Sequence, residues 1–254
     1  MKSFSMIGGN VKKILGQLPS MDNLPDADPD QRCPLCDGYG HIIDEKGARP
    51  CECVKKDVIL NTLEDSRVPK RFLNESLETF SHSNTKLRAC LSDAKKYVEN
   101  YSRENAQGLY IYGPTGVGKT HIAIGILKAL VEKGHSGVFY NIVDLLDAIR
   151  ATYDPQNNTA PKGQIEERLQ RQILVLDDFG VQKTSSWVAD RLYALINRRY
   201  QDCKTLIITS NLEYDNLKMR VDPALSSRII SMCRVIEVRG ADFRNSRAAV
   251  KRPG

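Results

Sequence analysis

Apolar residues recur along most of the chain in short blocks that alternate between two spacings. Five runs rich in β-branched or aromatic residues have the length of buried strands: 109–112, 137–143, 173–178, 205–211 and 234–239. The segments between them carry apolar residues three or four positions apart, which predicts helices. Strands that alternate with helices favour a three-layer α/β/α domain built on a five-stranded parallel sheet.

The same periodicity predicts helices outside the sheet region. They are expected at residues 54–66, 86–101, 143–153, 164–171 and 185–200, in a helix that follows the first strand and ends near Gly134, and within 213–233. Residues 68–73 contain a proline and suggest an extended linker. A leader helix with apolar positions from Ile7 to Leu18 ends at Pro19, and it either docks on a partner or packs on its own domain.

A glycine-rich turn joins the first of the five strands to its helix. Its sequence is Gly113-Pro114-Thr115-Gly116-Val117-Gly118-Lys119-Thr120. Glycines let backbone N–H groups close around phosphate oxygens, and the helix N-terminus adds partial positive charge. In this strand–turn–helix context the pattern predicts a P-loop, with Lys119 on the β- and γ-phosphates and the Thr120 hydroxyl on Mg²⁺.

Two carboxylates follow four apolar residues at the end of the run 173–178. This pattern is typical of a Walker B strand, in which Asp177 holds Mg²⁺ and Asp178 orients or deprotonates the attacking water. Asn211 ends the next strand and would lie beside the γ-phosphate if that strand sits between the P-loop and Walker B strands. A turn-forming asparagine is the alternative.

Four of the seven cysteines fall in a C-x2-C-x14-C-x-C array formed by Cys33, Cys36, Cys51 and Cys53. Two close pairs of thiolates can hold a tetrahedral Zn²⁺, and the stretch is too short for a hydrophobic core of its own. We therefore predict a small structural zinc module at residues 33–53. His41 could replace one sulfur, and reduced free thiols are the alternative.

The composition adds modest constraints. The chain has 254 residues, enough for one large domain with a small appendage, and its net charge of +6 permits a nucleic-acid partner without requiring one. No apolar run is long enough to span a bilayer, and Lys12 and Lys13 interrupt the first apolar stretch, which excludes a secretory signal. We expect a cytoplasmic protein with no membrane partner.

The order of the motifs resembles an AAA+ ATPase. Gly-Pro-Thr-Gly-Val-Gly-Lys-Thr, Leu-Val-Leu-Asp-Asp-Phe-Gly, Ile-Ile-Thr-Ser-Asn, Leu-Ser-Ser-Arg and Asp-Phe-Arg follow one another, as in replicative helicase loaders of the DnaC/DnaI type and in the transposition ATPase IstB. The resemblance covers about residues 68–250. The cysteine region is similar to the zinc-binding N-terminal module of some loaders.

The resemblance implies further roles. It assigns residues 113–120 to nucleotide phosphates, Asn211 to sensor 1, Arg228 to an arginine finger that reaches the ATP of a neighbouring copy, and Arg244 to sensor 2. A finger supplied in trans makes hydrolysis depend on self-association through the ATPase domain. An exposed helical arginine is the alternative for Arg228. The second Walker B carboxylate is Asp instead of the superfamily's usual Glu, and the chain lacks room for a full C-terminal lid.

The loader branch also lines a single-stranded DNA pore with a region that matches residues 144–171. Arg150, Lys162, Arg168 and Arg171 are the candidate phosphate contacts there, with Tyr153 as the one accompanying aromatic. A solvated charged face is the alternative.

These inferences divide the chain into a helicase-interaction region at residues 1–66, with the zinc module inside it, and an AAA+ domain at residues 67–254. The leading hypothesis is an ATP-dependent loader of a hexameric replicative helicase onto single-stranded DNA, with ATP, Mg²⁺ and Zn²⁺ as cofactors and weak turnover in the monomer. The alternatives are an IstB-like regulator of a transposase on duplex DNA, and a nucleotide-gated adaptor with little turnover.

Overall fold

A five-stranded sheet organises the larger part of the chain in this computed structural model, which describes residues 33–36, 39, 41–44, 47–80, 85–153, 162–180, 185–240 and 242. Its strands are β3 (Gly108–Tyr112), β4 (Gly137–Asn141), β5 (Ile173–Phe179), β6 (Thr205–Ser210) and β7 (Cys233–Glu237). The order is β4-β5-β6-β3-β7, and every neighbouring pair is parallel. The predicted α/β fold with a five-stranded parallel sheet is confirmed.

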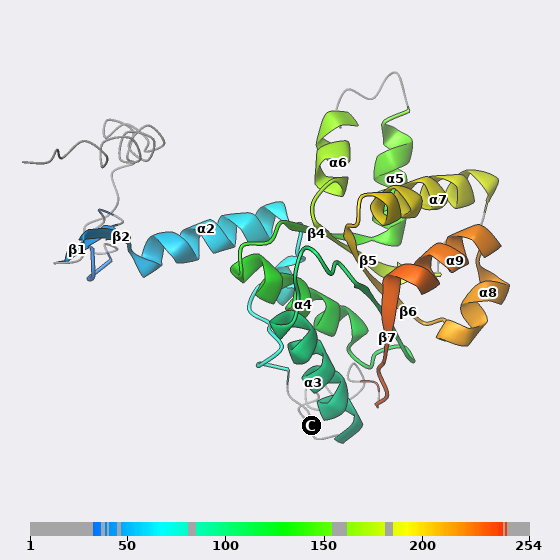
Figure 1. The fold of residues 1–254 in the computed structure, drawn as a ribbon, viewed down its shortest axis with the longest axis horizontal. Helices are drawn as coiled ribbons and strands as arrows, with labels where there is room; N and C mark the ends of the chain where they lie inside the picture. The colour runs from blue at the N-terminus through cyan, green and yellow to red at the C-terminus, as the bar shows by residue number, and fades with distance from the viewer. Residues whose placement is uncertain are drawn as a thin grey trace, which may run out of the picture. The chain divides into compact units, whose positions relative to one another are not determined.

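Helices cover both faces of this sheet (Figure 1). They are α3 (Thr85–Glu99), α4 (Lys119–Glu132), α5 (Ile142–Ala151), α6 (Lys162–Leu169), α7 (Ser186–Gln201), α8 (Leu217–Arg220), α9 (Pro223–Met232) and the short η4 (Tyr214–Asn216). Successive side chains of a strand point to opposite faces. Leu109 and Ile111 of β3 therefore belong to the core under α3 and α4, whereas Tyr110 belongs to the core under α5, α7 and α9.

The sheet order decides where the polar strand ends meet. β6 lies between β5 and β3, so the end of the Asn211 strand sits between the P-loop strand and the strand that carries Asp177 and Asp178. In parallel sheets, ligand sites form at the carboxyl ends of the strands, where the order reverses. The condition that the sequence analysis placed on Asn211 is therefore met.

One predicted connection has a different structure. The proline-bearing stretch 68–73 contains a turn of 3₁₀ helix, η3 (Lys70–Phe72), instead of an extended linker. Backbone bonds from Phe72 to Pro69 and from Leu73 to Lys70 close this turn. Pro69 itself is extended, as its fixed φ allows, and the turn begins only after it.

The chain divides into two compact units, residues 1–57 and 58–254, with the boundary inside α2 (Glu52–Asp65). Taken by itself, the described part of the first unit is an antiparallel pair, β1 (His41–Asp44) with β2 (Gly47–Pro50), flanked by the two cysteine pairs. This hairpin was not predicted from the sequence. The leader helix and the spacer after it lie outside the described residues.

Candidate nucleotide-binding site

The P-loop wraps the N-terminus of α4. Gly118 caps this helix with φ of +100°, a conformation that favours glycine, and a Cβ there would lie 2.5 Å from Cζ of Phe80. Glycine is thus required both by the backbone turn and by the aromatic ring that covers it. Gly118, Lys119 and Thr120 at the start of α4 line a pocket, and a helix N-terminus suits an anion.

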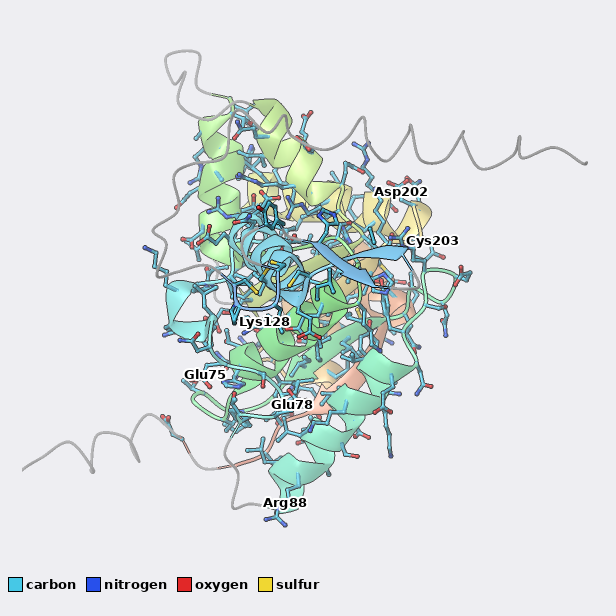
Figure 2. All side chains as sticks on the ribbon, turned by 90° about the vertical axis from the view of Figure 1, so that its left-hand side faces the viewer. Glu75, Glu78, Arg88, Lys128, Asp202 and Cys203 are labelled. Carbon is cyan, nitrogen blue, oxygen red and sulfur yellow. The ribbon has the colours of Figure 1, made fainter. Side chains whose placement is uncertain are left out.

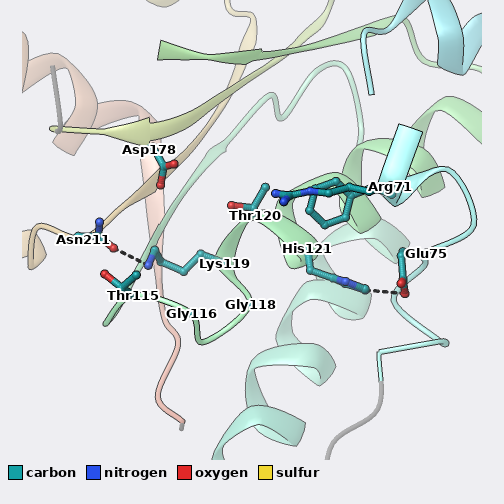
Figure 3. Close-up of a pocket in the computed structure, with 11 residues that line it drawn as sticks. Arg71, Glu75, Thr115, Gly116, Gly118, Lys119, Thr120, His121, Asp178 and Asn211 are labelled. Atoms are coloured by element: carbon teal, nitrogen blue, oxygen red, sulfur yellow. Dashed lines mark hydrogen bonds and ion pairs between the residues drawn. The ribbon is translucent and has the colours of Figure 1, made fainter. Parts of the chain in front are cut away.

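Lys119 lies inside this turn, with a buried side chain. Its ammonium donates to the carbonyl oxygens of Gly113 at 2.9 Å and Pro114 at 2.8 Å. It also donates to Oδ1 of Asn211 at 2.7 Å (Figure 3). Every one of these acceptors is an oxygen that phosphate oxygens could replace. The arrangement therefore fits a phosphate-bearing ligand at Lys119, with Asn211 beside the ammonium.

Asp177 accepts two hydroxyl hydrogen bonds on the same oxygen. Thr120 Oγ1 donates to Oδ1 at 2.8 Å, and Thr209 Oγ1 donates to it at 2.6 Å. Burial raises the pKa of the Asp177 carboxyl, and these two hydrogen bonds act in the opposite direction. A hydroxyl beside a carboxylate is a hard-oxygen donor set of the kind Mg²⁺ prefers, so Thr120 and Asp177 fit the predicted metal.

A bulge explains how two consecutive aspartates serve one site. In a regular strand Asp177 and Asp178 would point to opposite faces, but the β5–β6 register shifts between Leu176 and Phe179. Asp178 has φ of +59°, and its N–H donates to Thr209 Oγ1 at 3.0 Å. Asp178 therefore lines the pocket directly, while Asp177 lies behind Thr120. Thr209, which the sequence analysis missed, touches both.

The pocket has a volume of about 330 Å³. Thr115, Gly116, Gly118, Lys119, Thr120, Asp178 and Asn211 line it from the predicted motifs, and Arg71, Phe72, Glu75 and His121 line it from elsewhere (Figure 3). Arg71 and Phe72 were missed because residues 68–73 were interpreted as a linker, and Glu75 and His121 were not predicted to line the site. Three closely spaced polar or aromatic residues just after Pro69 were the one available signal.

Arg228, one of the two remaining predicted arginines, is not among the described residues that line this pocket. Arg228 lies on α9, where its Nε donates to Oδ1 of Asn197 at 3.2 Å and its guanidinium lies 4.7 Å from the centre of the Tyr200 ring. Both partners belong to α7, so the side chain is held at the surface of its own copy. Arg244 lies outside the described residues.

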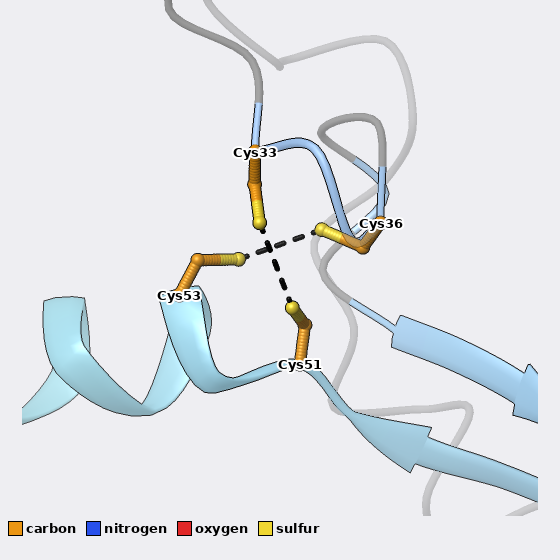
Figure 4. A group of neighbouring side chains, drawn as sticks. All are labelled: Cys33, Cys36, Cys51 and Cys53. Carbon is orange, nitrogen blue, oxygen red and sulfur yellow. Dashed lines mark hydrogen bonds between the residues drawn. The ribbon is translucent and has the colours of Figure 1, made fainter.

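The four predicted zinc ligands do converge. The Sγ atoms of Cys33, Cys36, Cys51 and Cys53 all lie within 4.8 Å of one another (Figure 4). A tetrahedral site with Zn–S bonds of about 2.3 Å has sulfurs about 3.8 Å apart. The observed separations are 3.8 Å for Cys33–Cys51 and 3.5 Å for Cys36–Cys53, so the cluster fits a structural Zn²⁺.

His41 is not a member of this cluster. Its Nδ1 lies 3.2 Å from the carbonyl oxygen of Tyr39. A hydrogen bond from the Leu35 backbone lowers the pKa of Cys33 to about 7, and hydrogen bonds with Cys36 and Cys51 raise the pKa of Cys53 to about 12.

The candidate DNA contacts differ in how they are engaged. Arg150 pairs with Asp147 at 2.9 Å and lies 5.0 Å from the centre of the Trp187 ring, with an exposed side chain. Arg171 is largely buried, donates to the Gly137 carbonyl and pairs with Asp65. Arg171 therefore has a structural role within the domain. Arg150 on α5 and Arg168 on α6 stay candidates for contacts with DNA phosphates.

Comparison with known proteins was consistent with this site. The chain is similar to the replicative helicase loader DnaC of Buchnera aphidicola subsp. Baizongia pistaciae, with 24% identity over 196 residues that cover 77% of this chain and 76% of the relative. It is 30% identical over 154 residues to a putative ATP-binding protein in an insertion sequence of Mycobacterium tuberculosis, covering 58% of each.

A solved structure extends the likeness to the backbone. The crystal structure of the DnaC helicase loader superposes with a TM-score of 0.60 at 30% identity, and the match covers 67% of this chain and 99% of that one. DnaA of Aquifex aeolicus bound to AMPPCP, at 19% identity and a TM-score of 0.55, shares the fold. The family described as IstB-like ATP binding protein matches residues 74–250, and the chain belongs to that family.

Proposed function

We propose that this protein binds ATP with Mg²⁺ in the P-loop pocket and hydrolyses it. The observation that carries the proposal is the convergence of Lys119, Thr120, Asp178 and Asn211 on one pocket, with Asp177 directly behind it. The motifs come from three neighbouring strand ends, which an accidental glycine-rich turn would not bring together. Family membership supports the ATP-binding part of the proposal.

Each polar group has a distinct role in this proposal. Lys119 binds the β- and γ-phosphates, Thr120 and Asp177 hold Mg²⁺, and Asp178 orients the attacking water and accepts its proton. Asn211 exchanges its hydrogen bond with Lys119 for one to the terminal phosphate. Arg228, from a neighbouring copy, stabilises the charge that develops in transfer, and Arg244 contacts nucleotide as sensor 2.

The proposed partner of this protein is a hexameric replicative helicase, which the protein loads onto single-stranded DNA in the cytoplasm. Relatives named DnaC helicase loader support this choice. Residues 1–66, with Zn²⁺ on the four cysteines, form the helicase-interaction region, and residues 67–254 form the ATPase. Arg150, Lys162 and Arg168 are the proposed contacts to DNA phosphates.

A second function is also supported by a specific observation. The family is described as IstB-like, and a relative at 30% identity belongs to an insertion sequence. A regulator of a transposase would assemble on duplex DNA with the same ATPase core. Preference for single-stranded or duplex DNA therefore separates the two functions.

The test is a reconstituted loading reaction. A hexameric replicative helicase, single-stranded circular DNA with a partial duplex, and ATP are combined with the full chain, and strand displacement is measured. Wild type should stimulate unwinding and Lys119→Ala should not. If wild type fails to retain the helicase and binds duplex in preference to single strands, the transposase function replaces the loader.

The same variants address turnover. If Asp178→Asn abolishes ATP hydrolysis yet supports full loading, whereas Lys119→Ala supports none, the protein is a nucleotide-gated adaptor and its turnover is incidental. If both variants fail, hydrolysis is part of loading.

A further inference from the structure

The wall of the pocket opposite the P-loop is carried by one short segment, residues 70–77, which lies along a single face of α4. Residues 121, 125 and 128 of that helix are four and three positions apart and share this face. His121 Nε2 lies 3.1 Å from the carbonyl oxygen of Ser76. At Gly125 a Cβ would lie 2.8 Å from Cδ2 of Leu77 and 3.2 Å from its backbone nitrogen.

Lys128 makes the third and most extensive of these contacts. Its ammonium donates to the carbonyl oxygens of Phe72 at 3.3 Å, Leu73 at 2.5 Å and Glu75 at 2.5 Å. An ammonium has three N–H groups, so its whole donor capacity is spent on this segment. Lys128 is 6% exposed, and Figure 2 shows it on the same side of the domain as Glu75.

The carbonyls of Phe72 and Leu73 lie at the end of η3, where acceptors run out of donors within the helix, and that of Glu75 follows shortly after it. A buried cation both satisfies them and complements the negative end of the turn. Removing it would leave the carbonyls of Leu73 and Glu75 without this donor, whereas the Phe72 carbonyl would keep the Glu75 N–H. A buried carbonyl that loses its donor favours hydration over burial. The segment would then move away from α4.

The segment bears the side chains that complete the pocket. Arg71, Phe72 and Glu75 line it on the side away from Asp178 and Asn211, and Arg71 stacks 4.4 Å from the centre of the Phe72 ring. The aromatic face of Phe72 and the carboxylate of Glu75 provide stacking and hydrogen bonding that suit a nucleoside, and a carboxylate repels phosphate. The Arg71 guanidinium, a group that binds phosphates as well as aromatic rings, lies here against the Phe72 ring.

We propose that Lys128 is a positioning residue for nucleotide binding, which acts by fixing this segment as the nucleoside-binding wall while the P-loop and Asn211 bind the phosphates. The inference rests on the proposed ATP site and assigns its two halves to separate elements. It separates the affinity for the triphosphate from the affinity for the nucleoside attached to it.

The test compares two ligands by calorimetry on the full chain: ATP and inorganic tripolyphosphate, each with Mg²⁺. Lys128→Met should raise the Kd for ATP by about tenfold or more and leave the Kd for tripolyphosphate within about twofold. Lys133→Met is the matched control, because Lys133 also donates to a backbone carbonyl, that of Val98, away from the pocket. It should change neither Kd.

A second variant reaches the same segment without touching Lys128. Gly125→Ala pushes on Leu77 and should give the same selective loss for ATP, so it decides the matter if Lys128→Met fails to fold. Equal loss of both ligands in a folded variant, or no loss of either, overturns the inference. If wild type itself binds neither ligand, the proposed ATP site fails first and the inference falls with it.

Discussion

The ammonium of Lys119 lies 2.7 Å from Oδ1 of Asn211, although 92 positions separate the two residues. The contact forms because β6, which precedes Asn211, is inserted between β5 and β3. It links the residue proposed to bind the phosphates with the residue proposed to sense the terminal one. Nucleotide binding must exchange this bond, which makes the pair a natural point at which ATP and ADP are distinguished.

Asn211→Ala tests that relationship. We expect ATP turnover to fall about 10²-fold, the scale for loss of one donor to a developing charge, while ADP affinity stays within about twofold. Phosphate release and calorimetry measure the two effects. Asn216→Ala is the control, since its amide donates to Glu213 outside the pocket. Equal weakening of ADP and ATP binding would assign Asn211 a structural role instead.

Asp177→Asn should abolish hydrolysis and stabilise the Mg²⁺-free protein. Burial raises the pKa of Asp177, so the folded state favours the protonated carboxyl, and the associated stability is present at low pH and lost as pH rises through that pKa. At pH 7 the ionised group therefore destabilises the fold. Asparagine removes the charge and can still accept from Thr120 and Thr209.

Thermal unfolding at two pH values checks this expectation. At pH 7 without Mg²⁺ the Tm should rise by about 2–4 °C, the scale for 1 kcal/mol in a domain of this size. The gain should shrink as the pH falls toward and below the raised pKa of Asp177, because the native carboxyl then becomes protonated. Asp178→Asn, whose side chain is only partly buried, should change Tm less. A Tm that falls at pH 7 would contradict the burial argument.

Arg228→Ala should impair turnover only in assemblies, because the finger is proposed to act on a neighbouring copy. Assemblies that contain only Arg228→Ala, or only Lys119→Ala, should be inactive. Mixing them should restore part of the activity, since some interfaces then join an intact P-loop to an intact arginine. ATP hydrolysis across mixing ratios measures this. If the rate of ATP hydrolysis of the mixture is no higher than that of each variant by itself, Arg228 acts within its own copy.

We expect about one equivalent of zinc per chain, because the four cysteine sulfurs form one cluster that supplies all four ligands of a tetrahedral Zn²⁺. Cys33→Ser combined with Cys36→Ser should lose the metal and the helicase interaction, yet keep nucleotide binding, since the P-loop pocket lies wholly in residues 58–254. Metal analysis and calorimetry measure both. Cys203→Ser, at an exposed free cysteine, should retain zinc.

Much of the larger unit was predictable because its signals are local. The apolar run from Ile173 to Leu176 predicts a buried strand. The glycine spacing before Lys119 predicts a tight turn at a helix N-terminus. The four cysteines likewise carry their chemistry in their spacing. Segment 70–77 was missed because its role depends on Lys128, which lies more than 50 residues further along the chain.

The sequence by itself determined which residues have the chemistry for phosphate, magnesium and zinc, and that strands alternate with helices. Only the tertiary structure decided that β6 lies between β3 and β5, that a bulge turns Asp178 toward the same pocket as Thr120, and that Thr209 joins both aspartates. The reason is physical: residue type and spacing are written in the chain, whereas strand order and register depend on how distant segments pack against one another.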